Sequence, residues 1–155
     1  MENKKKIAIG NDHAAVDMKN QIKNYIEELG YEVINVGTDT RESCDYPIPA
    51  YKVAKLVAEK EVVLGVLICG TGLGVSLAAN KVKGIRAACV SESVSSRYSR
   101  VHNNANIICF GARIVGVETA KEIVREFLNS EFEAGRHEKR VNQIIEIENT
   151  GSINV

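Results

Sequence analysis

The chain alternates five short apolar runs with stretches of helical periodicity, a pattern that few folds accommodate. The runs cover residues 5–10, 31–37, 62–69, 85–90 and 106–111, and their β-branched residues are typical of buried strands. The segments expected to be helical cover residues 18–29, 47–60, a stretch after Gly74, 93–100, 118–128 and 138–148. Because parallel strands need crossover connections, the alternation predicts a three-layer αβα sandwich around a five-stranded parallel sheet, the Rossmann-like α/β class.

Composition narrows the possible partners. A length of 155 residues fits a single domain over residues 1–155, and 45% hydrophobic residues are enough for a sizeable core. Since 20 basic side chains balance 20 acidic ones, nothing electrostatic indicates nucleic acid or an anionic membrane as partner. No apolar segment reaches the ~18 residues of a membrane span and no secretory signal is recognised, so we expect a cytoplasmic protein.

The cysteines and histidines do not show the spacing of a metal site. No CxxC pair is present, so neither a zinc ribbon nor a dithiol redox centre is predicted, and we expect no metal. Cysteines in apolar runs are usually small buried side chains, and we expect this of Cys89 and Cys109. The cysteines and histidines of the chain are Cys44, Cys69, Cys89, Cys109, His13, His102 and His137.

Polar residues follow several of the predicted strands. In open parallel sheets ligands bind beyond the carboxyl ends of the strands, near the point where strand order reverses. "NDHAA" follows the first strand and "CGTGLG" ends the third. If the strand order is 2-1-3-4-5, these two ends flank the reversal point, and Asp12, His13 and Cys69 share one cleft.

The glycine loop after Cys69 fits no nucleotide motif. A dinucleotide loop needs G-x-G-x-x-G, but Val75 stands where the third glycine belongs, and a Walker loop would need a lysine at the helix start. A row of backbone N–H groups at a helix N-terminus remains, able to hold an anion or a developing oxyanion. The alternative is a tight strand-to-helix turn. The same donors would favour the thiolate of Cys69, which could act as a nucleophile or a base.

The other polar motifs have a functional and a structural interpretation. Asp12 and His13 could bind a sugar hydroxyl or a phosphate, or Asn11 or Asp12 could simply cap a helix. Arg136 and Arg140 are four residues apart, a spacing that places both on one helix face, suited to a dianionic phosphate or to solvent. Arg113 is a third candidate ligand or a surface charge.

Taken together, "NDHAA", "CGTGLG", "RVHNNAN", "GAR" and "GRHEKR" resemble the ribose/galactose phosphate isomerase family, in order along nearly the whole chain. The resemblance implies interconversion of D-ribose 5-phosphate and D-ribulose 5-phosphate through a cis-enediolate, with no cofactor. It also implies a homodimer or homotetramer whose site is shared between subunits. The small-molecule partner is then a sugar phosphate.

The resemblance also implies roles for individual residues. Cys69 would carry the proton between C2 and C1, and His102, helped by Asp12, would open the furanose ring. The residues that it implies as substrate ligands are His13, Tyr46, Gly70, Thr71, Gly72, Leu73, Gly74, Asn103, Arg113, Arg136 and Arg140.

Two other functions fit the same motifs. One is an isomerase of six-carbon phosphates, of the allose-6-phosphate or galactose-6-phosphate type. The galactose type works as two different subunits, and the complete motif set in one chain favours the homomeric ribose type. The other is a non-catalytic module that binds a sugar phosphate, for which the thiol would be dispensable.

Overall fold

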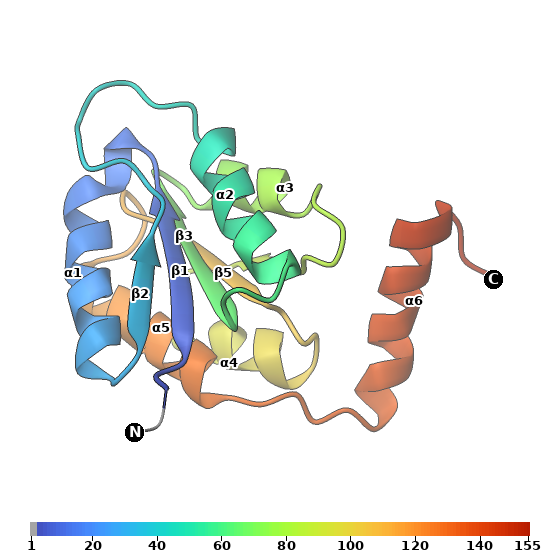
Figure 1. Cartoon of the computed structure of the whole chain (residues 1–155). Coiled ribbons are helices and arrows are strands. Elements are labelled where there is room, and N and C mark those ends of the chain that lie inside the picture. The colour runs from blue at the N-terminus through green and yellow to red at the C-terminus, as the bar shows by residue number, and fades with distance from the viewer. Residues whose placement is uncertain (1–2) are drawn as a thin grey trace.

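A five-stranded parallel sheet forms the centre of the structure, a computed structural model that describes residues 3–155 (Figure 1). Met1 and Glu2, the start of the predicted domain, lie outside the described residues. The strands are β1 Lys6–Asn11, β2 Glu32–Asn35, β3 Leu64–Cys69, β4 Ala87–Cys89 and β5 Ile107–Gly111. Each paired strand runs parallel to its neighbour, as the alternating pattern predicts.

The strand order is β2-β1-β3-β5-β4, so the order 2-1-3-4-5 is wrong. The last strand, not the fourth, pairs with β3. All five residues of β5 are buried, which suits a strand with neighbours on both sides, whereas the three residues of β4 are only partly covered, which suits an edge. β1 and β3 remain neighbours in both orders, so the reversal point still lies between their carboxyl ends.

Helices cover both faces of the sheet and confirm the three-layer sandwich (Figure 1). Ile7 and Ile9 of β1 face α1 and α5, whereas Ala8 between them faces α2 and α3, in the alternation expected of a strand. α4 packs on α5, where the Ser96 hydroxyl donates to the Ile123 carbonyl at 2.6 Å. The helices are η1 His13–Ala15, α1 Val16–Glu28, α2 Pro47–Ala58, α3 Leu73–Ala79, α4 Ser93–Val101, α5 Val117–Asn129 and α6 Arg136–Thr150.

The last helix, α6, stands beside the sandwich instead of covering the sheet (Figure 1). Within its described span, Val141 is the one buried residue, and the apolar side chains of Ile144 and Ile147 are each 47% exposed. One carboxylate, that of Glu148, accepts a hydrogen bond from the backbone N–H of Gly84 at 3.1 Å. α6 therefore presents apolar side chains that its own chain leaves largely uncovered.

No helix within residues 3–155 combines the length and the hydropathy that crossing a membrane requires.

Candidate active site

Cys69 is the last residue of β3, and its side chain is 4% exposed. Its Sγ accepts a hydrogen bond from the backbone N–H of Gly72 at 3.1 Å. Gly72 has φ +81°, and a Cβ there would lie 2.7 Å from the backbone of Phe110, so the turn requires glycine at this position. The loop thus folds back toward the sulfur and directs a backbone N–H at it.

The other strand cysteines have different surroundings. Cys109 on β5 is fully buried, as predicted, and burial raises the pKa of its thiol well above the usual value. Cys89 is exposed, so its prediction as a buried side chain is wrong; it ends the short edge strand β4. Desolvation, with a smaller effect of Cys69, raises the pKa of the Cys89 thiol. Of these three thiols, Cys69 is the one that accepts a backbone N–H in the described structure.

Asp12 and His13 follow β1 and lie beside the end of β3. The backbone N–H of Asp12 donates to the Ile68 carbonyl at 3.3 Å, which places Asp12 next to Cys69. The carboxylate of Asp12 accepts the N–H of Ala14 at 3.0 Å, so the helix-capping interpretation is also correct. Asp12, His13 and Cys69 thus lie at adjoining strand ends, and the prediction that they share one cleft stays a prediction.

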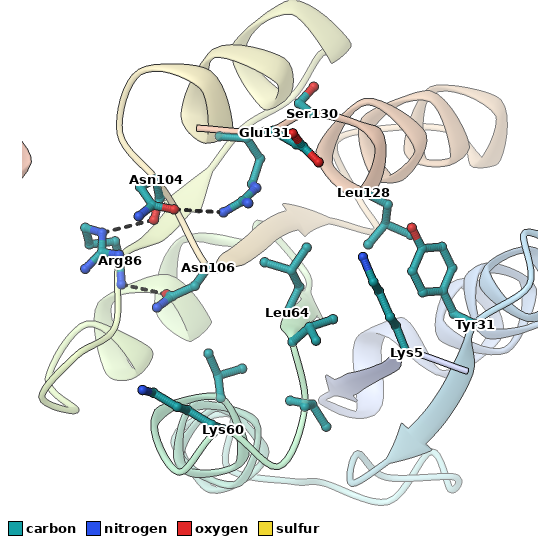
Figure 2. A pocket seen from close by; sticks show the side chains of 14 residues that line it. Lys5, Tyr31, Lys60, Leu64, Arg86, Asn104, Asn106, Leu128, Ser130 and Glu131 are labelled. Carbon is teal, nitrogen blue, oxygen red and sulfur yellow. Dashed lines mark hydrogen bonds between the residues drawn. The ribbon is translucent and has the colours of Figure 1, made fainter. Parts of the chain in front are cut away.

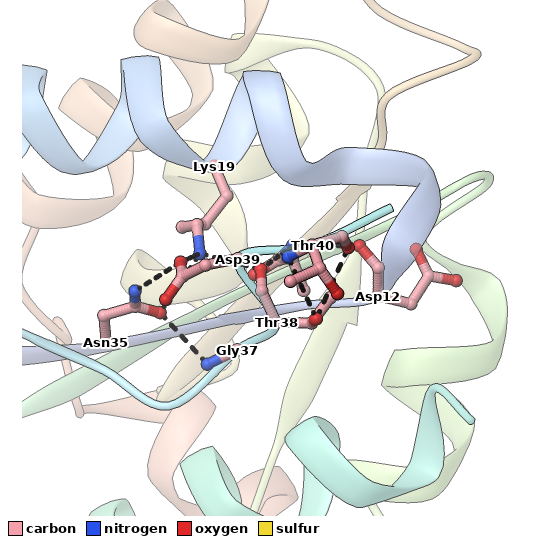
Figure 3. Close-up of polar contacts among 8 residues, drawn as sticks. Asp12, Lys19, Asn35, Gly37, Thr38, Asp39 and Thr40 are labelled. Atoms are coloured by element: carbon pink, nitrogen blue, oxygen red, sulfur yellow. Dashed lines mark hydrogen bonds and ion pairs between the residues drawn. The ribbon is translucent and has the colours of Figure 1, made fainter. Parts of the chain in front are cut away.

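The loop between β2 and α2 is tied down by a lysine that sequence analysis missed (Figure 3). Lys19 of α1 is fully buried, and its ammonium group donates to the carboxylate of Asp39 and to the Thr38 carbonyl at 3.0 Å. The side-chain amide of Asn11 donates to the same carbonyl at 3.0 Å. Further along the loop, the N–H of Cys44 donates to Nδ1 of His13 at 3.1 Å. The hydrogen bond from Lys19 is the main reason that the pKa of Asp39 is lowered.

Tyr46 and Arg113 flank the glycine loop. A Cβ at Gly74 would lie 2.7 Å from the ring of Tyr46, so this ring packs directly on the loop backbone. Arg113 donates its backbone N–H to the Gly70 carbonyl at 3.0 Å and lays its guanidinium group over Gly70. We call the residues gathered at this edge of the sheet the carboxyl-end cluster: Asp12, His13, Tyr46, Cys69, Gly70, Thr71, Gly72, Leu73, Gly74 and Arg113.

His102 and Asn103 lie at the opposite edge of the sheet. They follow α4 and precede β5. In the same loop, the backbone carbonyl of Asn106 accepts a hydrogen bond from the N–H of Gly65 at 2.9 Å. Gly65 is near the start of β3, whereas Cys69 is its last residue, so roughly 13 Å of strand separates them at ~3.3 Å per residue. One chain therefore does not bring His102 to its own Cys69.

A pocket of about 520 Å³ opens at this end of the sheet, where the strands begin. Residues that line it hold the loop of His102 in place (Figure 2). Asn104 has φ +47° and bridges two guanidinium groups. Its carbonyl accepts from Nε of Arg86 at 3.0 Å, and its Oδ1 accepts from Arg100 at 3.2 Å. The arginines in this pocket thus hold the loop conformation, and the pocket lies far from the carboxyl-end cluster.

Arg136 and Arg140 both lie on α6, which confirms the helical spacing predicted for them. They belong to the His102 side of the molecule, because the rings of His102 and His137 stack with centroids 4.2 Å apart. We call this second group the α4–α6 cluster: His102, Asn103, Glu133, Arg136, His137 and Arg140. Glu133 and His137 were missed, since nothing in their sequence positions connects them to His102.

The α4–α6 cluster contains three potential metal ligands but has the wrong charge for a cation. Ligand atoms of His102, Glu133 and His137 lie within 4.8 Å of one another, although the histidines are scattered in the sequence. However, the positive end of α6 and its two arginines surround them, and such surroundings favour an anion. Desolvation and then the nearby His102 and Arg136 lower the pKa of His137.

Comparison with known proteins identifies the family of the chain. Residues 7–144 match the family model described as Ribose/Galactose Isomerase. The chain belongs to the ribose/galactose isomerase family. The resemblance found in the motifs is thereby confirmed over most of the chain.

Named members of the isomerase family are similar along nearly their whole length. The chain is 50% identical to ribose-5-phosphate isomerase B of Escherichia coli, over 93% of this chain and 97% of that protein. It is 43% identical to D-erythrulose-4-phosphate isomerase of Pectobacterium atrosepticum, over 89% and 91% of the two chains.

Solved structures of the isomerase family share the fold. Ribose-5-phosphate isomerase B of Clostridium thermocellum has a TM-score of 0.92 and 50% identity, covering 95% of this chain and 99% of that one. The Mycoplasma genitalium protein of the same name, solved with bound ribulose-5-phosphate, has a TM-score of 0.88 and 38% identity, with 94% and 97% covered.

Proposed function

We propose that this isomerase interconverts D-ribose 5-phosphate and D-ribulose 5-phosphate through a cis-enediolate. The observation that carries the proposal is the Cys69 sulfur, fixed at the end of β3 and hydrogen-bonded by the amide of Gly72 at 3.1 Å. Family members named ribose-5-phosphate isomerase B support this choice of substrate.

The chemistry needs one base and one set of oriented donors. The Cys69 thiolate takes the proton from C2 of the open-chain aldose, and the C2–H electrons form the C1–C2 double bond as negative charge moves to O1. N–H groups of residues 70–74 stabilise that oxygen. Transfer of the O2 proton to O1 and return of the first proton to C1 complete the ketose. Because every electron pair stays within the sugar, no redox cofactor is required.

We further propose that a second copy of the chain completes each site. His102 and Cys69 lie at opposite edges of one sheet, so the acid and base that act on one sugar come from two copies. The partner would contribute the α4–α6 cluster, with His102 opening the furanose ring beside Asp12 and with Asn103 contacting the sugar. Arg136 and Arg140 would hold the phosphate.

Exposed apolar side chains support an assembly of this kind, a homodimer or a homotetramer. Leu73 and Leu77 on α3, next to the glycine loop, are 59% and 67% exposed. The apolar side chains of α6 are also largely uncovered. Covering both surfaces would remove apolar area from water at the place where the two clusters must meet.

A panel of four-, five- and six-carbon aldose phosphates tests the substrate, with ketose formation and exchange of the C2 proton in D2O as readouts. We expect the highest kcat/KM with D-ribose 5-phosphate. A preference for a six-carbon phosphate would instead indicate the allose or galactose type. Binding of the sugar phosphates with neither turnover nor C2 exchange would indicate a non-catalytic binding module.

A further inference from the structure

The imidazole of His102 is the middle ring of a three-ring stack. Its centroid lies 4.5 Å from that of the Tyr98 ring and 4.2 Å from that of His137, with interplanar angles of 17° and 16°. Two nearly parallel rings at such distances cannot share one face of an imidazole, so they lie on opposite faces. The plane of the His102 ring is therefore set from both sides.

The stack, and not a hydrogen bond, orients this ring. Within residues 3–155, the hydrogen bonds of His102 involve its backbone, whose N–H donates to the Tyr98 carbonyl at 2.8 Å. Both ring nitrogens thus stay available for proton transfer. An imidazole that must reach a sugar oxygen at roughly 2.6–3.2 Å needs a defined orientation, and here stacking supplies it.

His137 reaches the stack through a tight turn anchored to α4. The N–H of Glu133 donates to the Val101 carbonyl at 3.1 Å, next to His102. Ala134 and Gly135 then adopt φ +55° and +54°, which reverses the chain into α6. The Glu133 carboxylate lies 3.8 Å from Nε2 of His137, on the exposed side of the ring.

We propose that His137 is a positioning residue for His102 in sugar ring opening. The assignment rests on the proposed function, in which His102 is the acid and base for that step. His137 holds the plane of the His102 ring, and its own ring transfers no proton.

The charges around the stack agree with this division of labour. Three other charged or titratable neighbours of His137 affect its pKa besides His102 at the end of α4: Glu133 in the segment before α6, and Arg136 and Arg140 on α6 itself. A protonated His137 would be repelled by both arginines, so the charges around it favour the neutral ring.

The test compares a substrate that must be opened with one that has no ring. D-ribose 5-phosphate closes to a furanose, whereas D-erythrose 4-phosphate cannot, because its O4 is phosphorylated. We expect His137→Ala to lower kcat/KM for D-ribose 5-phosphate by roughly tenfold or more while changing that for D-erythrose 4-phosphate less than about twofold. His137→Phe keeps a flat ring and should recover most of the loss.

Parallel assays of His102→Asn separate the two proposals. If His102→Asn lowers kcat/KM equally for both substrates, the assignment of ring opening to His102 is wrong. If His102→Asn is selective but His137→Ala has the kcat/KM values of the wild type, His137 has no positioning role. The same conclusion holds if His137→Ala lowers kcat/KM equally for both substrates and His137→Phe does not restore it. Circular dichroism melting of each variant identifies any general loss of folding.

Discussion

The two clusters of functional residues are built in different ways. In the carboxyl-end cluster, the backbone of the glycine loop and buried side chains such as Lys19 fix every position. In the α4–α6 cluster, ring stacking orients the side chains of His102 and His137, and the arginines lie on a helix largely outside the sandwich. In the proposed reaction, the first cluster supplies a base and its donors, and the second supplies an acid and cations.

This difference follows from what each cluster has to do in the proposed reaction. An oxyanion is stabilised only by donors that do not need to reorganise, which favours a loop packed on the sheet. Groups that reach a second copy must project from the fold, which favours a protruding helix. On the proposed function neither cluster suffices alone, and the experiments below test how each cluster is built and what it contributes.

The largest effect is expected for Cys69→Ala. Removing the base should lower kcat at least about a hundredfold while the sugar phosphate still binds, because general-base catalysis typically contributes that much or more. Cys89→Ser, a change at the exposed neighbouring thiol, is the matched control and should keep its activity. Near wild-type turnover in Cys69→Ala would remove Cys69 from the role of base.

Mixing two inactive variants tests whether the clusters meet across copies. When Cys69→Ala and His102→Asn chains reassemble at random, half of the dimers are mixed, and each mixed dimer has one intact site. We expect recovery of about a quarter of wild-type activity on D-ribose 5-phosphate. Absence of recovery, with exchange of subunits shown by mass spectrometry, would place both residues in one copy's site.

The arginines of α6 should affect binding more than chemistry. Arg136→Ala or Arg140→Ala should raise KM for D-ribose 5-phosphate roughly tenfold with little change in kcat, because each loses a hydrogen bond to a charged group. The preference for phosphorylated over free sugar should fall in parallel. Unchanged preference in both variants would exclude them as phosphate ligands.

The smallest effect concerns the support of the carboxyl-end cluster. Lys19→Met should lower the free energy of unfolding by about 1–2 kcal/mol, because the Thr38 carbonyl loses a donor while the exposed Asp39 stays solvated. Lys23→Met, which breaks a solvent-exposed pair with Glu27, is the control and should cost less than about 0.5 kcal/mol. Equal losses of unfolding free energy in the two variants, measured by urea unfolding, would show that burial of Lys19 adds nothing to stability.

The pH dependence of this pair has a defined sign. The pKa of Asp39 is lower in the folded protein than its ordinary value of 3.8, so the unfolded chain binds the proton first as pH falls. The contribution of the pair is complete above that value and disappears as pH drops through the folded pKa. The stability difference between wild type and Lys19→Met should therefore shrink in the same acid range.

Sequence alone was sufficient for the layers and for the carboxyl-end cluster. Strand periodicity and strand ends are local properties, and parallel strands bring their carboxyl ends to one edge whatever their order. The position of β5 in the sheet could not be predicted from such local properties. Strand order depends on which strand has neighbours on both sides, and this is a property of the whole sheet. The exposure of Cys89 follows from that same edge position.

Long-range side-chain contacts were the part that sequence did not reveal. The stack of His102 on His137 joins segments separated by a whole strand and helix, and no local pattern connects them. Lys19 did leave a signal, since it shares a helix face with Ala15, Ile22 and Ile26, all buried. A lysine on such a face needs partners for its ammonium group, which here are Thr38 and Asp39 in the loop between β2 and α2.

The position of α6 beside its own sandwich has a kinetic consequence. On the proposed division of the site, an isolated chain would hold every catalytic residue and yet no complete catalyst. Specific activity would then fall on dilution although each chain stays folded, because two copies must associate before a site is complete. The concentration of the protein would therefore set the fraction of chains that are active.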